Sequence, residues 1–493
     1  MDKNKLTFES KSLSAKLAAI LMVAFILTSL QRFSVHPSGG HTHRQADTLG
    51  MAMVFAEDLK QRGFQAFDFI FLPKILQKGL LDGINASEFP LMNILCGPFF
   101  LLGSWIGVFC SSLFVLLVNL GVAYLFVPRI VRFWGVRLDG LISLVIWFSI
   151  PVIASQSNIF MPEGFAFPLM VVGICFILEG LENYKKYICG ILLCNLAIAV
   201  KPTVVISFIL LAAFWLMEQN RKYIYRLILA IGLGVLFPFY WYEFHSKWIL
   251  SFAQGPQIFA LAGFNPFEKL QEVGLSEIVK LIFREIYQGQ FPMFLGIIWI
   301  FCAMWAREWT MLLCYIVSLV AAISLDGPHI KIHGYYFIGT GIVTILLIAK
   351  VLSKFESKVW ISRLLVLSLF WGLMYDLRGN IWIWARDSQY WKVNFWEMGS
   401  IARSKIPETY RLITDDSQYP QKMLFIGRSG YMASGDVFMP CTDSHYRNEP
   451  LAIVVDGDNS DYLYSCQNRD VTVEVLKTSF ATWSLIKAVP KKG

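Results

Sequence analysis

The sequence predicts an all-α membrane protein with many spanning helices and a small C-terminal domain outside the membrane. Hydrophobic residues make up 56% of the chain, and the mean hydropathy is +0.54. Charged residues contribute only 16%, whereas a soluble domain carries about 25%. The apolar runs have the length of spanning helices rather than the short alternation of barrel strands. After Asp376 the composition becomes polar, which indicates a separate domain.

The first apolar run, residues 17–33, follows four lysines, so its N-terminal end is expected on the cytoplasmic side. No small-residue cleavage motif precedes Gln31, which favours an uncleaved anchor over a signal peptide. With this run the sequence predicts about 11 transmembrane helices. The other ten are expected at roughly residues 106–129, 137–155, 158–181, 187–200, 202–218, 223–243, 289–306, 309–325, 335–352 and 359–376.

Basic residues between the runs predict the direction of each span, because short cytoplasmic loops are enriched in lysine and arginine. The loops expected inside carry Arg129, Arg132, Arg137, Lys185, Lys186, Arg221, Lys222, Arg307, Lys350, Lys354 and Lys358. This pattern places two large loops outside, residues 34–105 and 244–290, together with everything after Asp376. The net charge of +8 therefore reflects membrane topology rather than binding to nucleic acid.

Residues 89–104 form a further apolar segment that does not fit this alternation. A full crossing here would invert every later basic loop, and at about 1.5 Å per residue the segment is short for the hydrocarbon core. We interpret it as a juxtamembrane helix that is interfacial or re-entrant on the outer face. A genuine short span is the alternative.

The region after the last span, residues 377–493, is expected to be a small α/β or mainly β domain outside the membrane. Its roughly 100 residues are enough for a core of its own. Three short apolar stretches between turn residues predict strands, namely Met423–Gly427, Leu451–Val455 and Val471–Leu476. Cys441 and Cys466 both fall in this domain, where either a disulfide outside the reducing cytosol or two free thiols fits the sequence.

The polar segment directly after the first span carries a candidate catalytic carboxylate. Asp47 precedes an expected helical stretch, Leu49 to about Leu59, where aspartate is a favoured N-cap. The same carboxylate could take a proton from an acceptor hydroxyl as a general base. Both roles are compatible, because a helix N-terminus keeps a carboxylate ionised. His43 and Arg44 are expected to hold an anionic group nearby.

Three further features are expected on the same outer face. Glu163 stands at the outer end of a span, where it either complements the helix dipole or serves the reaction. Lys201 interrupts an apolar run of about 30 residues, so it is functional, paired or a snorkelling lysine at a span end. His333 and Tyr336 start another span, either as site residues or as part of an interfacial aromatic belt. Their convergence on one face indicates a site.

These residue types suit group transfer from a lipid-phosphate donor. Lys201 and Arg44 could grip the phosphate, with His333 and Tyr336 as further candidates. The apolar cleft would take a polyprenyl chain, and Asp47 would activate the acceptor. The sequence contains no Walker loop and no His-Glu-x-x-His or Cys-x-x-Cys spacing. It therefore predicts no cofactor and no metal ligands, and it leaves a need for a divalent metal open.

At these residues the chain resembles the GT-C glycosyltransferases that use polyprenyl-phosphate sugars. The likeness is to the bacterial branch of the protein O-mannosyltransferase family, which includes the lipid A aminoarabinose transferase and the lipopolysaccharide galacturonosyltransferases. His43 to Thr48 is similar to the first-loop Arg-Gln-Ala-Asp-Thr motif, and Glu88 to Leu91 to the Glu-Pro-Pro-Leu motif. Asn158 to Glu163 resembles a segment that often contains Pro-Asp. Lys201-Pro202 and His333 to Tyr336 are similar to the later Lys-Pro and His-x-Tyr-Tyr features.

The resemblance covers roughly residues 1–376 and implies a GT-C transmembrane catalytic domain. Asp47 is then the catalytic carboxylate, with Glu163 as a second, and His43 and Glu88 line the acceptor side of the cleft. The implied activity is a hexosyl or pentosyl transfer that usually inverts the anomeric centre. The implied location is the bacterial inner membrane, with the site and the C-terminal domain in the periplasm. Lipid A or lipopolysaccharide, another envelope glycan, or a protein is the implied acceptor.

Two other classes of protein also have many spans. A transporter or flippase for a lipid-linked glycan would explain buried charges, but not the long polar loop after the first span, and no internal repeat is evident. An O-antigen ligase or polymerase would favour an arginine-rich late loop, whereas residues 244–290 contain only one arginine, Arg284.

The chain departs from the family at Phe89, where the motif has a second proline, and in its C-terminal domain.

Overall fold

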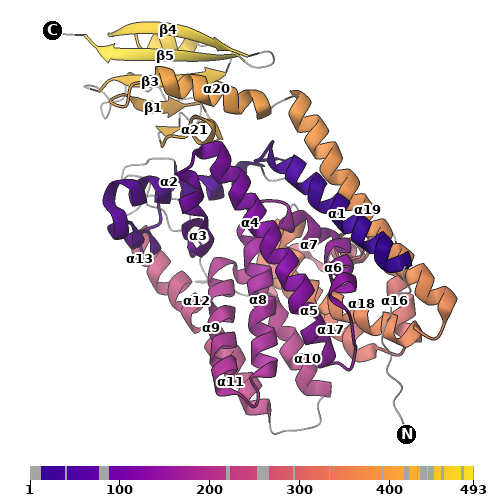
Figure 1. Ribbon diagram of the computed structural model, residues 1–493. Coiled ribbons are helices and arrows are strands. Elements are labelled where there is room, and N and C mark those ends of the chain that lie inside the picture. Colours follow the sequence, from indigo (N-terminus) through magenta and orange to yellow (C-terminus); the bar gives the residue numbers. More distant parts are fainter. Residues whose placement is uncertain are drawn as a thin grey trace. The chain divides into compact units, whose positions relative to one another are not determined.

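A computed structural model gives the architecture of the chain (Figure 1). It describes residues 13–38, 42–76, 88–217, 223–251, 266–291, 295–331, 333–390, 392–415, 421–429, 431–432, 441, 449–456, 460–478 and 482–491. The chain divides into two compact units, which are considered separately below. Unit 1 comprises residues 1–30, 115–245 and 259–380, and unit 2 comprises residues 31–114, 246–258 and 381–493.

Long apolar helices confirm that the chain is a multi-pass membrane protein. Within the part that the structure describes, seven helical stretches are long and apolar enough to cross a membrane, or eight if one bent pair counts as a span. The seven are α1 (Leu13–Phe33), α4 (Ser104–Leu125) with α5 (Val127–Arg132), α8 (Pro162–Glu179), the stretch Ile224–Ile249, α17 (Trp309–Asp326), η8 (Gly334–Thr340) with α18 (Gly341–Phe355), and α19 (Val359–Tyr390). The bent pair is α6 (Gly140–Ser149) and α7 (Pro151–Ser157), which meet at 96°.

Several of the roughly 11 expected spans consist of shorter pieces. Pro202 ends one apolar run, so that α9 (Tyr184–Val200) is followed by a 3₁₀ turn, η2 (Pro202–Phe208), and then by α10 (Ile209–Met217). The run expected at residues 289–306 contains only ten helical residues, α16 (Gly296–Trp305). The stretch Ile224–Ile249 is composed of α11 (Ile224–Gly234), α12 (Leu236–Tyr240), a π-helical turn η4 (Trp241–His245) and most of α13 (Ser246–Leu250).

In unit 1 the helices α8 and α9 pack side by side, and Figure 1 shows them as an antiparallel pair. The first and last long helices are also linked, because the Asn380 side chain donates a hydrogen bond to the Ser29 hydroxyl over 3.2 Å. α19 continues past the change of composition at Asp376 as one helix of 32 residues. Three further elements pack on α17, namely α14 (Pro266–Val273), α15 (Leu275–Arg284) and η7 (Gly327–Lys331). The π-helical turn η5 (Glu285–Gly289) packs against α7, α15 and α16.

In unit 2 the first large loop folds into α2 (Thr42–Arg62), η1 (Gly63–Ile70) and α3 (Leu91–Phe100). α3 packs on α2, and the Asn93 side chain donates to the Thr48 carbonyl over 2.7 Å. With ten residues α3 is about 15 Å long, half of what the hydrocarbon core requires. The short helix expected at residues 89–104 therefore does not have the length of a span.

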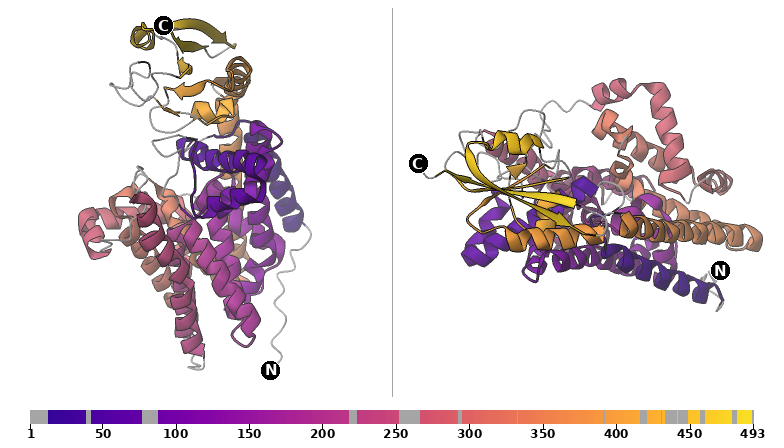
Figure 2. Two further views of the ribbon diagram at one scale, coloured as in Figure 1. Left: turned by 90° about the vertical axis from the view of Figure 1, so that its left-hand side faces the viewer. Right: turned by 90° about the horizontal axis from the view of Figure 1, so that it is seen from above.

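The C-terminal part of unit 2 is the expected small α/β domain. Its five-stranded sheet has the order β2-β1-β3-β5-β4, with parallel pairing of β1 to β2 and β3 and antiparallel pairing around β5. Figure 2 shows these strands from two further directions. The strands are β1 (Arg411–Thr414), β2 (Tyr431–Met432), β3 (Leu451–Asp456), β4 (Arg469–Lys477) and β5 (Thr482–Pro490), and the helices are α20 (Lys392–Lys405), α21 (Gln421–Ile426) and α22 (Ser460–Ser465).

One of the three expected strands is wrong. Met423–Gly427 was expected to be extended, whereas Met423 to Ile426 belong to α21. The parallel pairing of β1 with β2 requires a crossover connection, which is usually helical. Gly427, with φ +72°, ends this helix in the left-handed conformation, and its amide bonds to the Met423 carbonyl over 2.8 Å. The other two stretches form β3 and β4 as expected.

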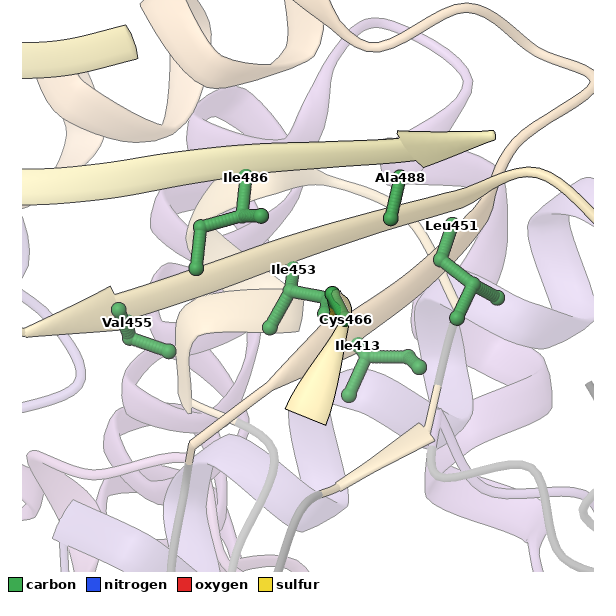
Figure 3. Packing of buried hydrophobic residues seen from close by; sticks show 7 residues of the cluster. All are labelled: Ile413, Leu451, Ile453, Val455, Cys466, Ile486 and Ala488. Carbon is green, nitrogen blue, oxygen red and sulfur yellow. The ribbon is translucent and has the colours of Figure 1, made fainter. Parts of the chain in front are cut away.

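A dry cluster fills one face of the sheet (Figure 3). Its members come from β1, β3, β5 and the residue directly after α22, and they are Ile413, Leu451, Ile453, Val455, Cys466, Ile486 and Ala488. Cys441 packs against this cluster and forms a disulfide with Cys466, with Cα atoms 4.9 Å apart. The sequence left the disulfide and the free thiols equally open.

Candidate active site

Asp47 lies inside α2 and not at its N-terminus. The helix begins at Thr42, so Asp47 is in its second turn and the expected N-cap role is wrong. The extension has a local cause in Gln45, whose amide nitrogen donates to the Ser38 carbonyl over 2.9 Å and whose oxygen accepts from the Ser38 amide over 3.3 Å. This double contact fixes Ser38 against the first turn of α2, and the helix starts upstream of Asp47.

The Asp47 carboxylate is half-buried and has no hydrogen bond or ion pair to any described residue. Burial raises its pKa to about 6, Arg44 acts in the opposite direction and Glu88 adds a smaller increase. A carboxyl group with such a pKa is mostly ionised at pH 7 and is more basic than an exposed aspartate. Asp47 is therefore chemically suited to accept a proton.

Arg44 and Glu88 form an ion pair beside Asp47 in the same unit. The Arg44 guanidinium donates to the Glu88 carboxylate over 2.7 Å, and the two side chains remain 22% and 14% exposed. Residues 77–87, which precede Glu88, lie outside the described residues. His43 belongs to the first turn of α2, but its side chain also lies outside the described part of the chain.

The second group of expected site residues lies in unit 1. Lys201 and Glu163 form an ion pair over 2.9 Å, and both side chains have no exposed surface. Glu163 is in the first turn of α8, and Lys201 directly follows α9. The helix dipoles therefore favour a negative charge at Glu163 and a positive charge at Lys201.

Tyr336 and His333 border this ion pair. The Lys201 ammonium lies 5.2 Å from the centre of the Tyr336 ring, and the ring centres of Tyr336 and His333 are 5.8 Å apart. Gly339 allows η8 to approach η2, because a Cβ at this position would collide with the Thr203 carbonyl. The Ser207 hydroxyl, which donates to the Gly339 carbonyl over 2.9 Å, fixes the same contact.

Buried polar oxygens close in sequence to the ion pair lack hydrogen-bond partners among the described residues. They are Oε1 of Gln156, Oδ1 of Asn158 and Oγ1 of Thr203. An unsatisfied buried polar atom costs about 1–3 kcal/mol, so such atoms are uncommon and often mark functional sites. Asn158 begins the segment that resembles the family motif ending in Glu163.

Sequence reasoning missed Glu285. This carboxylate is 3% exposed in the π-helical turn η5, and burial raises its pKa to about 7 while Arg284 acts in the opposite direction. In the large loop of residues 244–290, only the basic residues have a clear interpretation from sequence. The sequence offers only a weak signal, an acidic residue directly after an amphipathic helix and four positions before Gly289.

Neither a scan against protein-family models nor a search of curated proteins finds a match to the chain. Among the solved structures that match, two do so over 96% of this chain and 97% of their own. ArnT from Cupriavidus metallidurans bound to undecaprenyl phosphate has a TM-score of 0.59 at 12% sequence identity. The apo state of the same protein has a TM-score of 0.56 at 13% identity. The chain has the GT-C fold.

The GT-C fold confirms the expected architecture over almost the whole chain, including the region after residue 376 in which no likeness was expected. At 12% identity the likeness concerns the fold alone. The roles of individual side chains within this GT-C fold therefore rest on the contacts described above. Asp47, Arg44 and Glu88 come together in unit 2, and the other group, composed of Glu163, Lys201, His333 and Tyr336, comes together in unit 1.

Proposed function

We propose that the chain is a membrane glycosyltransferase that moves a sugar from a polyprenyl-phosphate donor to an acceptor outside the cytoplasm. The observation that carries the proposal is the half-buried Asp47 carboxylate, which has no partner among the described residues and a pKa of about 6. The fold supports the same chemistry, because the similar ArnT structure contains undecaprenyl phosphate.

In the proposed reaction an acceptor hydroxyl attacks the anomeric carbon of the donor sugar. The bond between this carbon and the phosphate oxygen breaks, and polyprenyl phosphate leaves with the bonding electrons. The proton of the hydroxyl passes to Asp47, which acts as the general base. Attack on the side opposite the phosphate inverts the anomeric centre, as the resemblance to the family implies.

We assign Lys201, His333 and Tyr336 to the donor phosphate. The Lys201 ammonium is a buried positive charge with three N–H donors, which suits it to bind an anion. A fixed cation stabilises the charge that develops on the leaving phosphate. Glu163 then orients Lys201 and does not itself act on the substrate. We assign Arg44 to a different anionic group, which belongs to the donor or to the acceptor. To bind this group, Arg44 would leave its ion pair with Glu88.

We also propose that the reaction takes place at the periplasmic face of a bacterial inner membrane. The basic loops support this orientation, with residue 185 in the cytoplasm and residues 47, 163, 201 and 400 outside. Single cysteines at these positions can be labelled in intact cells with a membrane-impermeant reagent. Labelling at position 185 without labelling at position 400 would contradict the proposed orientation.

The function is tested by mass spectrometry of the cell envelope. Cells that lack the protein are compared with cells that carry the wild-type chain or Asp47→Asn. The expected result is the loss of one sugar unit from a lipopolysaccharide, another envelope glycan or a protein in the deletion and the Asp47→Asn cells alone. Identical envelope products in all three would refute a transfer function. The mass and fragmentation of the missing unit identify the sugar and the acceptor.

A further inference from the structure

The segment that carries His333 and Tyr336 is held at both ends by one turn of unit 1. Before this segment, the Arg284 guanidinium donates to the carbonyls of Ile330 and Lys331 over 3.2 and 3.0 Å. After it, the Gln290 amide donates to the Phe337 carbonyl over 3.2 Å. Arg284 and Gln290 flank η5, so this single π-helical turn binds Ile330 and Lys331 at one end and Phe337 at the other.

The interior of the same turn is built around Glu285. Its carboxylate accepts from Arg284 over 3.3 Å, which ties the guanidinium to the turn. The other carboxylate oxygen occupies the space over Gly289, where an added Cβ would collide with it. The backbone amide of Gln290 bonds to the Glu285 carbonyl over 2.8 Å and closes the turn. π-helical turns are rare in proteins, and those that occur are often found at functional sites.

The Gln290 end of the turn is also supported from α18. The Thr344 hydroxyl donates to the Gln290 amide oxygen over 3.0 Å, which leaves the amide nitrogen free to reach the Phe337 carbonyl. Glu285, Gln290 and Thr344 are all buried. Burial of a carboxylate costs free energy. A buried polar network that joins η5 to α18 and to the segment with Tyr336 therefore indicates a specific positioning role.

We propose that the turn from Arg284 to Gln290 is a clamp that positions His333 and Tyr336 for donor binding, with Glu285 as the residue that holds Arg284 in place. The inference rests on the donor-binding role assigned to His333 and Tyr336. Glu285 acts through Arg284 and is a positioning residue. Release of either end of the clamp would loosen η8 and separate the Tyr336 ring from the Lys201 ammonium.

Two variants release the clamp with little change of volume. Glu285→Gln removes the charge that holds Arg284, and Thr344→Val removes the hydroxyl that orients Gln290. Glu277→Gln is the matched control, because Glu277 lies on the preceding helix and pairs only with the exposed Lys280 among the described residues. All are made in the full-length chain in detergent or lipid nanodiscs.

The first measurement is hydrogen–deuterium exchange of residues 330–340, which requires no activity. Exchange should accelerate about fivefold in both clamp variants, as expected for the loss of one hydrogen bond, and stay at the wild-type rate in Glu277→Gln. The second is steady-state kinetics. The donor KM should rise about fivefold in both clamp variants while the acceptor KM is unchanged, a division that general destabilisation would not produce.

The possible outcomes separate the clamp from the proposed function. If the wild-type chain transfers sugar and both variants keep the wild-type donor KM and exchange rate, the clamp is wrong. If the wild-type chain transfers no sugar, the proposed function fails, and the exchange of residues 330–340 still tests the clamp. If Glu285→Gln does not fold, Thr344→Val alone decides, because valine keeps the volume and removes only the hydroxyl contacts to the Gln290 amide oxygen and the Thr340 carbonyl.

Discussion

The ion pairs of the two units differ in how completely the protein has enclosed them. Lys201 and Glu163 have no exposed surface in unit 1, whereas Arg44 and Glu88 keep 22% and 14% of their side-chain surface exposed in unit 2. Desolvation of two charges is costly, and the mutual attraction offsets it only while both partners are present. A partly exposed pair costs less free energy to exchange for another anion.

This difference in exposure indicates a structural role for the buried pair in unit 1 and a chemical role for Asp47 in unit 2. The Lys201–Glu163 pair is integral to the folded state, and each residue depends on the other. Asp47, beside the partly exposed pair, has no such partner among the described residues and so remains available for a substrate. The comparison predicts that a substitution at Asp47 affects turnover alone, whereas a substitution at Lys201 affects stability as well.

The largest expected effect is that of Asp47→Asn on turnover. Loss of a general base typically reduces the rate by on the order of 10²–10⁴. The free energy of unfolding should remain near the wild-type value, because Asp47 has no partner to lose among the described residues. Turnover is measured with purified protein, and stability by thermal unfolding in detergent. Asp68→Asn, which removes a carboxylate elsewhere in unit 2, is the control and should retain turnover. Turnover near the wild-type rate in Asp47→Asn would remove Asp47 from the chemistry.

The next effect concerns stability in unit 1. Lys201→Met leaves Glu163 buried without its cation, and loss of one partner of a buried pair costs about 3–5 kcal/mol. The double variant Lys201→Met/Glu163→Gln removes both charges and should recover most of this loss. Its donor KM should nevertheless remain raised, because the cation for the phosphate is absent. Recovery of both stability and donor binding in the double variant would make the pair purely structural.

The pH dependence of kcat/KM sharpens the comparison further. Asp47 must be ionised to act as a base, so activity should fall about tenfold per unit as the pH decreases below about 6, the pKa of Asp47, and should level off above it. Glu88→Gln removes a neighbouring negative charge and releases Arg44, and both changes lower the pKa of Asp47. The inflection should therefore move to lower pH in this variant. An unchanged inflection would assign it to another group.

The smallest expected effect is that of Arg44→Lys. Lysine keeps the positive charge but cannot form two parallel hydrogen bonds as the planar guanidinium does. We expect about a tenfold rise in the KM of the substrate that Arg44 binds, equivalent to about 1.4 kcal/mol. Arg62→Lys, at the other end of α2, is the matched control. A wild-type KM in Arg44→Lys would show that this arginine does not bind a substrate.

Much of the fold could be predicted because hydrophobic length and periodicity determine it. The expected span at residues 309–325 corresponds closely to α17, and the apolar stretch at Leu451–Val455 forms β3. The errors occurred where short apolar runs have no period of their own. Met423–Ile426 is helical because the parallel neighbours β1 and β2 need a crossover, a constraint that a local sequence window does not contain.

The candidate site was predicted less completely, because pairing is a tertiary property. The lysine at position 201 stood out in an apolar run, but nothing in the sequence specified Glu163 as its partner. Asp47 was identified, but its position within α2 was wrong because the contact between Gln45 and Ser38 begins the helix upstream. Glu285 was not predicted, because its role depends on a π-helical turn and on its contact with Gly289. A π-helical turn has no simple sequence signature.

The oxidation state of the Cys441–Cys466 pair reports the compartment in which the C-terminal domain folds. Disulfides form and persist in oxidising compartments, whereas cytosolic thiols are kept reduced. Whole cells can be treated with a thiol-blocking reagent, lysed, reduced and then treated with a mass-adding maleimide. Two added tags on the chain, absent when the reduction is omitted, would mean that the sheet matured beyond the inner membrane. The native cysteines thus report the orientation of the chain without any engineered label.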